Sequence, residues 1–252
     1  MFHQRAGKIL FSGIWKLGLS EVIVIFARFP RLGEVKTRLA AFLGAKRALE
    51  LYEAFLLDTI ERLMSLPSDV ALFLADSTEN ENMAFAEFHA LPESLKIYSQ
   101  RGSDLGQRMW NAYGELSVNR GKILFVGADS PNLPLYFFGK AYKKLNQYAV
   151  VWAPAVDGGY CLLGLSKPLP NIFRGISWGT SRVLSETREK LRGKDYYELP
   201  QWYDVDDLAG LKSLITDLSI SDSVPPRTAN LLKSGPFKRY MKPEGSSIRH
   251  NR

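Results

Sequence analysis

The stretch EVIVIFARFPRLGEVKTRLA, residues 21–40, decides how this chain folds. It opens with an apolar run, which is typical of a strand covered on both faces. The run ends in a turn around Gly33, and a helical pattern follows. A strand that leads through a turn into a helix predicts the first unit of an α/β fold. The turn also carries four basic side chains: Arg28, Arg31, Lys36 and Arg38.

The same alternation continues along the chain. Apolar residues at helical spacing are clearest over residues 45–64, and weaker helical patterns lie between or after the later apolar runs. Alternating elements of this kind predict a doubly wound α/β fold, with a mostly parallel central sheet and helices on both faces. The later strands are expected at 70–75, 122–127, 149–154 and 160–165, and the weaker helices at 79–88, 104–117, 135–146, 180–191 and 207–217.

The positive charge of the chain is concentrated at its two ends. The formal net charge is +7, of which residues 1–19 contribute +3 and residues 223–252 contribute +6, so residues 20–222 carry the remaining −2. A nucleic-acid-binding domain shows its positive charge on a folded face, so we expect no nucleic-acid partner. We expect residues 20–222 to form one domain, preceded by an N-terminal extension and followed by a basic, flexible tail.

Cysteine and histidine offer little for redox or zinc chemistry. The single cysteine, Cys161, excludes an intramolecular disulfide and lies in an apolar run, where an inert core thiol is expected. The three histidines are scattered, so we expect no Cys/His zinc site. Lys16 interrupts the apolar patch near the start, and no apolar run approaches the ~20 residues that span a bilayer. We therefore expect a cytoplasmic protein without a transmembrane segment.

Polar residues gather where the predicted strands end. Ligands of open α/β sheets bind beyond the carboxyl ends of the strands. The turn after the first strand is basic, and carboxylates follow the strands at 122–127 and 149–154. A further acidic segment, YDVDD at 203–207, precedes the last predicted helix. We therefore expect the basic turn and the carboxylates to share one edge of the sheet.

The basic turn has the features of a phosphate site. Lys36 and Arg38 lie at the start of a helix, and Gly33 allows the backbone to approach a ligand closely. The turn is not a Walker A loop, because Val35 precedes Lys36 where that motif needs glycine. A solvated basic turn is the alternative interpretation, since runs of charge usually face water.

Three carboxylate clusters are expected to face this turn. Carboxylates gathered at one sheet edge repel one another unless a cation lies between them, and hard oxygen ligands of this kind suit Mg²⁺ or Mn²⁺. Each cluster also has a structural alternative, namely a loop residue, a turn or a helix cap. Basic side chains opposite metal-binding carboxylates are what the phosphates of a nucleotide require. The clusters are Asp129 in GADSP, Asp157 in DGGY, and Asp204, Asp206 and Asp207 in YDVDD.

Six segments occur in the order FARFPRLGEVKTRLA, GSDLGQRM, VGADSPNLP, PAVDGGYCLLGL, ISWGTSRVL and YDVDD. Together they resemble the radical-SAM/selenodomain-associated transferase family, which belongs to the nucleotide-diphospho-sugar transferase superfamily. The match spans about residues 21–217. Members of this family are often labelled glycosyltransferases. The resemblance implies the glycosyltransferase-A fold, which is Rossmann-like.

The resemblance also implies roles for single residues. In the nucleotidyltransferases of the superfamily, Lys and Arg residues in the first loop hold the triphosphate, and Lys36 and Arg38 match them, with Arg28 beside them. Asp129 matches an aspartate that binds the metal after the fourth strand. Asp206 matches a late aspartate that supplies the second metal contact.

The late acidic segment departs from the pattern of the superfamily. Asp207 replaces a threonine, and Gly210 stands where a last aspartate is expected. The helix cap is therefore expected to differ, and Asp204 remains an alternative to Asp206 as the second ligand.

The resemblance places the remaining candidates around the base and the acceptor. Asp104 and Arg108 lie where relatives recognise the base or ribose, and an ion pair between the two is the alternative. Trp178 either stacks on a sugar or packs as a core aromatic. The substrate or acceptor side is expected to comprise Asp157, Gly158, Gly159, Trp178 and Thr180.

Three functions are compatible with these features of the sequence. A glycosyltransferase that uses a nucleotide-sugar follows from the family label. A nucleotidyltransferase that joins an NTP to a phosphorylated acceptor follows from the strongly basic loop, because a triphosphate presents more charge than a diphosphate. A non-catalytic nucleotide-binding or partner module is the third, although binding alone needs fewer carboxylates. Both enzymatic hypotheses require a small-molecule acceptor.

Overall fold

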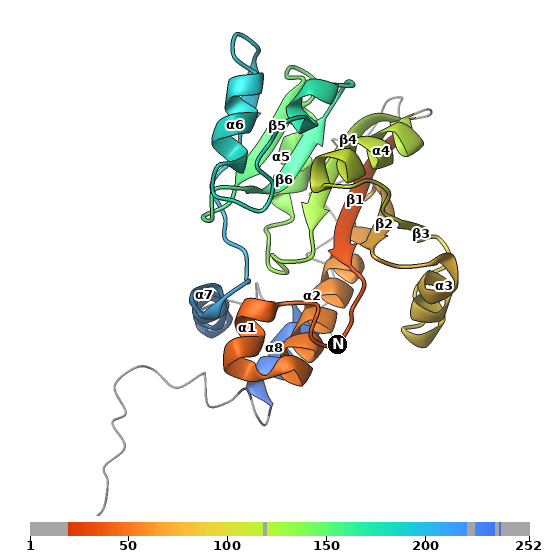
Figure 1. Ribbon diagram of the computed structural model, residues 1–252, viewed down its shortest axis with the longest axis vertical. Coiled ribbons are helices and arrows are strands. Elements are labelled where there is room, and N and C mark those ends of the chain that lie inside the picture. The colour runs from red at the N-terminus through yellow and green to blue at the C-terminus, as the bar shows by residue number, and fades with distance from the viewer. Residues whose placement is uncertain (1–19, 118–119, 221–224, 235–236, 238–252) are drawn as a thin grey trace, which may run out of the picture.

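The computed structural model describes residues 20–117, 120–220, 225–234 and 237, and its centre is a seven-stranded sheet (Figure 1). The strand order is β3-β2-β1-β4-β6-β5-β7. The strands are β1 (Ser20–Arg28), β2 (Asp69–Ala75), β3 (Lys96–Ser99), β4 (Arg120–Gly127), β5 (Val150–Pro154), β6 (Tyr160–Leu165) and β7 (Tyr196–Glu198). The helices are α1 (Thr37–Leu43), α2 (Ala45–Met64), α3 (Glu79–Phe88), α4 (Leu105–Ser117), α5 (Tyr136–Lys144), the 3₁₀ helix η1 (Pro170–Phe173), α6 (Val183–Lys190), α7 (Leu208–Ile220) and α8 (Pro226–Lys233).

Most neighbouring strands run parallel, as the sequence predicts. The pairs β1–β2, β1–β4, β2–β3 and β5–β7 are parallel, whereas β6 runs antiparallel to both β4 and β5. Residues 155–159 between β5 and β6 are too few for a crossover helix, so the chain turns back as a hairpin. This hairpin brings the start of β6 to the edge where β1 and β4 end.

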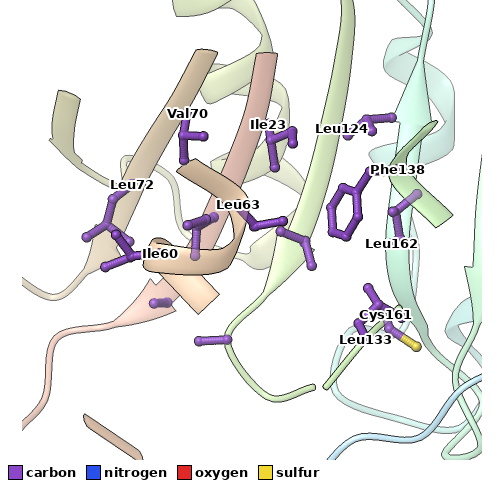
Figure 2. Close-up of a cluster of buried hydrophobic side chains, with 14 of the residues drawn as sticks. Ile23, Ile60, Leu63, Val70, Leu72, Leu124, Leu133, Phe138, Cys161 and Leu162 are labelled. Atoms are coloured by element: carbon purple, nitrogen blue, oxygen red, sulfur yellow. The ribbon is translucent and has the colours of Figure 1, made fainter. Parts of the chain in front are cut away.

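Each face of the sheet is covered by helices. Side chains along β1 alternate between two cores: Ile23 and Ile25 face the core under α2, α3 and α5, while Val22 and Val24 face the core under α4, η1 and α6. Figure 2 shows Ile60 and Leu63 of α2 beside strand residues of the first core. The predicted arrangement, with helices on both faces of a mostly parallel sheet, is confirmed.

A third core lies beyond the sheet, where α1, α2, α7 and α8 gather at one end of the molecule (Figure 1). It is built from Leu39, Phe55, Leu211 and Leu232, which are all fully buried. This core fixes α1 and α7, the two helices that follow Lys36 and the acidic segment.

The domain extends further than residue 222, where the sequence placed its end. Helix α8 packs on α2, and the carboxylate of Asp58 accepts hydrogen bonds from the backbone N–H groups of Arg227 at 3.1 Å and Thr228 at 2.7 Å. Phe237 is also buried, at 1% exposure. The expected flexible tail is therefore wrong for these residues, because a helix 170 positions earlier supplies their cap. The N-terminal extension and the rest of the tail lie outside the described residues.

Candidate functional site

A pocket at the carboxyl ends of β1 and β4 contains most of the predicted site residues. Its volume of about 820 Å³ is typical of sites for small molecules and cofactors. The hairpin between β5 and β6 forms part of its wall. The predicted residues that line it are Arg28, Lys36, Arg38, Asp104, Arg108, Asp129, Asp157, Gly159, Trp178, Thr180, Asp204 and Asp206.

The side chain of Lys36 joins two carboxylates that lie far apart in the sequence. Its Nζ donates hydrogen bonds to Oδ1 of Asp129 and, at 2.5 Å, to Oδ1 of Asp206. The side chain of Lys36 is only 2% exposed, whereas the two carboxylates are 45% and 44% exposed. Lys36 thus contacts Asp129 and Asp206 from the buried interior, and both carboxylates remain partly accessible to solvent.

The backbone of the basic turn directs Lys36 inward. Gly33 has φ 81° and Lys36 has φ 48°, so the chain passes twice through the left-handed region before α1 begins. A side chain other than glycine rarely adopts this conformation, and its surroundings must hold it there. The two ion pairs of Lys36 supply that constraint. Gly33 itself is exposed and does not line the pocket, so its place in the turn follows from its φ angle.

The positive charge of Lys36 and the negative charges of its two carboxylate partners stabilise one another. Burial alone would lower the pKa of Lys36, but Asp129 and Asp206 outweigh it and raise this pKa. Burial likewise opposes the ionised form of Asp206, yet the charge of Lys36 keeps the pKa of Asp206 below its usual value. Lys36 and Asp206 are therefore both charged at neutral pH.

Hydrogen bonds fasten the two acidic segments to each other. The N–H of Val205 donates to the carbonyl of Asp129 at 2.8 Å, and the hydroxyl of Ser130 donates to the carbonyl of Tyr203 at 2.9 Å. Asp129 and Asp206 consequently lie next to the backbone hydrogen bond that joins Val205 to Asp129. Their relative position is set by the fold rather than by flexible side chains.

A buried polar network holds the same two segments on α7. The amide of Asn132 donates to the hydroxyl of Tyr203 and to Oδ2 of Asp217, each at 2.7 Å. The hydroxyl of Tyr203 donates to the same Asp217 oxygen at 2.6 Å. Asn132 is 1% exposed, so these bonds are shielded from water. No local sequence pattern links residues 132, 203 and 217, so this network was not predicted.

At the end of the acidic segment, Asp207 caps helix α7. A helix cap was the alternative to metal binding for an aspartate of this segment. Oδ1 of Asp207 accepts from the N–H of Gly210 at 2.9 Å at the start of α7. Asp206 is thereby free to face Lys36. A Cβ on Gly210 would lie 2.3 Å from the carbonyl oxygen of Asp204, so the close approach of α7 requires glycine there.

Asp204 lies in a strongly negative part of the pocket. Burial, followed by the charges of Asp157 and Asp206, raises the pKa of Asp204 to about 6. Asp157 also forms a turn, because its Oδ1 accepts from the N–H of Gly159 at 2.8 Å. Among the described residues, no three Asp, Glu, His or Cys side chains stand close enough to form a metal site as they are. Asp129 and Asp206 instead share the ammonium group of Lys36.

The other basic residues near the first turn have two different roles, since two line the pocket and one forms a structural ion pair. Arg28 and Arg38 are exposed and line the pocket. Arg31 turns toward α3, where it pairs with Glu81 at 2.5 Å and donates to the carbonyl of Asp76 at 2.5 Å. Lys36, Arg28 and Arg38 can therefore face a ligand, while Arg31 fixes the turn to its neighbours.

The segment GSDLGQRM also contributes to the pocket, through residues 103–105, 108 and 109. Oδ1 of Asp104 caps α4 by accepting from the N–H of Gln107 at 2.8 Å. Among the described contacts, Arg108 pairs with Asp76 at 3.6 Å and donates to the carbonyl of Gly102, instead of pairing with Asp104. Arg108 is thus held in place while it lines the pocket.

The expected acceptor residues surround the β5–β6 hairpin. Trp178 lines the pocket and packs closely on α4, where a Cβ on Gly106 would lie 2.6 Å from its ring nitrogen. Both interpretations of Trp178 are thus compatible with its position. Gly158 does not line the pocket, and its φ of 91° and its contact with the backbone of Ser181 explain the glycine.

Several pocket-lining residues were not predicted as site residues, among them Tyr52, Gln100 and Cys161. The hydroxyl of Tyr52 donates to the carbonyl of Arg28 and accepts from its N–H, which anchors the end of β1. The amide of Gln100 donates to the carbonyls of Ala27 and Phe73. Cys161 also lines the pocket, but burial raises the pKa of its thiol to about 12, in agreement with an inert core cysteine.

A relative at 30% identity identifies the family. It is a structure from Desulfovibrio desulfuricans G20, provisionally assigned as a nucleotide-diphospho-sugar transferase, and the match covers 87% of this chain and 97% of that one with a TM-score of 0.81. The chain belongs to this nucleotide-diphospho-sugar transferase family, and as a member of it the protein is a transferase. A family described as "Uncharacterized protein conserved in bacteria (DUF2064)" matches residues 59–180. No curated protein matches the sequence.

Two more distant structures share the fold. A cytidylyltransferase from Leptospira borgpetersenii serovar Hardjo-bovis is 13% identical, with 92% of this chain and 100% of that chain covered and a TM-score of 0.53. The 4-diphosphocytidyl-2C-methyl-D-erythritol synthase of Anaerococcus prevotii is 11% identical, with 77% and 95% covered and a TM-score of 0.51. The expected glycosyltransferase-A-like fold is confirmed. Within the described part of the chain, no helix has the length and apolar character needed to cross a bilayer.

Proposed function

We propose that this protein is a metal-dependent transferase that moves a glycosyl group from a nucleotide-sugar to a small-molecule acceptor. The observation that carries the proposal is the meeting of Lys36 with Asp129 and Asp206 inside a pocket of about 820 Å³. A cation and two carboxylates at the end of parallel strands suit a diphosphate together with its metal ion. The 30% identity to the Desulfovibrio protein favours a nucleotide-sugar as the donor.

The donor set of the pocket fits a divalent cation. Two carboxylate oxygens already converge on one point, the Nζ of Lys36, and hard oxygen ligands are those that Mg²⁺ and Mn²⁺ prefer. Asp129 and Asp206 would hold the ion, with Asp204 beside them. When bound, the ion neutralises charge on the departing diphosphate.

The remaining lining residues divide between the donor and the acceptor. Arg28, Lys36 and Arg38 bind the phosphates. Asp104 and Arg108 contact the base or ribose. The acceptor side is the β5–β6 hairpin and the loop before α6, and it comprises Asp157, Gly159, Trp178 and Thr180.

Nucleotidyl transfer from an NTP to a phosphorylated acceptor is the second candidate. It is favoured by the three basic residues of the first turn that face the pocket, Arg28, Lys36 and Arg38. A triphosphate carries more charge than the diphosphate of a nucleotide-sugar, so it gains more from three cations.

A two-stage experiment tests the proposal. The melting temperature is first measured with a panel of NTPs and nucleotide-sugars, with and without Mg²⁺. The best donor is then incubated with sugar-phosphate and alcohol acceptors, and the released product is identified. Release of nucleoside diphosphate supports glycosyl transfer, and release of pyrophosphate supports nucleotidyl transfer. A protein that binds donors but releases neither product would act as a binding module.

A further inference from the structure

Lys36 occupies the position that its two neighbours would give to a metal ion. Its Nζ lies within hydrogen-bond distance of one oxygen from Asp129 and one from Asp206, at 2.5 Å from the latter. The buried ammonium group also lies 5.7 Å from the centre of the Phe55 ring, which favours a cation at this point. In this arrangement the lysine neutralises the two carboxylates.

The proposed function, on which this inference rests, assigns Lys36 to phosphate and the two aspartates to a divalent cation. Both assignments cannot hold while Lys36 bridges the aspartates. An ammonium group and a divalent cation repel each other strongly at such distances, and they compete for the same oxygens. Lys36 must therefore leave Asp129 and Asp206 before a divalent cation binds between them.

We propose that Lys36 is a tethered counter-ion, which holds Asp129 and Asp206 until the phosphates of a nucleotide draw it away. The lysine then changes partners from carboxylate to phosphate, and the divalent cation takes its former position. Each ligand favours the arrangement that the other needs, so nucleotide and metal bind cooperatively. Without nucleotide, the protein binds the metal weakly.

The surroundings of Lys36 allow this exchange. The turn that carries it is exposed at residues 32–34 and again at 37 and 38, so a change there leaves the sheet intact. Arg28 and Arg38 also line the pocket, and their positive charges attract the phosphates. The carboxylates are fixed by the bond between Val205 and Asp129, so they keep their positions when the lysine leaves.

Mn²⁺ binding in the absence of nucleotide tests the proposal. The affinity is measured by electron paramagnetic resonance for the wild type, Lys36→Met and Arg38→Met. Methionine keeps a linear side chain but removes the competing charge, so Lys36→Met should bind Mn²⁺ about tenfold more tightly than the wild type. Arg38→Met removes an equal charge that acts on Asp206 only from a distance. It should therefore strengthen binding by only about two- to threefold.

A bound nucleotide should increase the Mn²⁺ affinity of the wild type in the same way as the Lys36→Met substitution does. The nucleotide that raises the melting temperature most should tighten Mn²⁺ binding to the wild type about tenfold, and have much less effect on Lys36→Met. Equal Mn²⁺ affinity in Lys36→Met and Arg38→Met would overturn the counter-ion role. Lys36→Gln, which is neutral and polar, replaces the methionine variant if that variant does not fold. A wild type that binds no nucleotide would refute the proposed function, while the comparison without nucleotide would still decide the role of Lys36.

Discussion

The two walls of the pocket hold their charges in different ways. On the basic wall, two exposed residues line the pocket: Arg28 at the end of β1 and Arg38 at the start of α1. On the acidic wall, Asp129 and Asp206 lie in segments that are joined by backbone hydrogen bonds and anchored on α7 through Asn132. The acidic wall is therefore part of the folded core, while the basic wall lies on its surface. Substitutions on the acidic wall should change stability and activity together, and those on the basic wall should change binding alone.

The largest effect is expected from Asp206→Asn. This change removes a proposed metal ligand, so turnover should fall about 100-fold or more. The melting temperature should also fall, because the buried Lys36 keeps only one of its two carboxylate partners. Initial rates and thermal unfolding measure the two effects. The matched control is Asp207→Asn, since asparagine can still cap α7. Full turnover in Asp206→Asn would remove this residue from the site.

Gly210→Ala should distort the acidic wall through its backbone. The added Cβ would lie 2.3 Å from the carbonyl of Asp204, so we expect a loss of about 2 kcal/mol or more in the free energy of unfolding. Gly114→Ala is the control, because this helical glycine has open space around it. It should raise stability by about 0.5–1 kcal/mol. Denaturant unfolding measures both, and equal changes in the two variants would contradict the close contact at Gly210.

Tyr203→Phe tests the network that anchors the acidic wall. It removes the hydroxyl that bonds to Asp217 and Asn132, so the free energy of unfolding should fall by about 1–2 kcal/mol. Tyr136→Phe, at a residue that is 54% exposed, should change stability by less than about 0.5 kcal/mol. A Tyr203→Phe variant as stable as the wild type would show that the network contributes little.

The smallest effect is expected on the basic wall. Arg38→Ala should weaken nucleotide binding about three- to tenfold by removing one charged contact to phosphate. The melting temperature of the free protein should stay the same, because Arg38 is exposed. Calorimetric titration measures the affinity, and Lys46→Ala on α2, away from the pocket, is the control. Unchanged affinity in Arg38→Ala would place the phosphates elsewhere.

The parts of the fold that follow from local pattern were predictable. Helix α2 occupies the predicted residues 45–64, and the five predicted strands are all present. The strands β3 and β7 were not predicted, because they are short and none of their residues is fully buried. The meeting of Lys36 with Asp129 followed from one rule, that ligand-binding residues lie at the carboxyl ends of parallel strands.

What the sequence did not reveal depends on contacts between distant residues. The cap that Asp58 provides for α8 joins positions 169 and 170 residues apart, so residues 226–233 resembled a tail. The pairing of Arg31 with Glu81 likewise cannot be read from the basic turn alone. In both cases the residue types were visible, and only the packing of helices decided their partners.

We propose that Lys36, Asp129 and Asp206 together receive a nucleotide and its metal ion. Crystals grown with Mn²⁺ and the nucleotide that stabilises the protein most would test it directly by anomalous scattering. We expect a Mn²⁺ peak between Asp129 and Asp206, with the Nζ of Lys36 on a phosphate oxygen. A peak elsewhere, or a lysine that still bridges the two carboxylates beside a bound nucleotide, would contradict it.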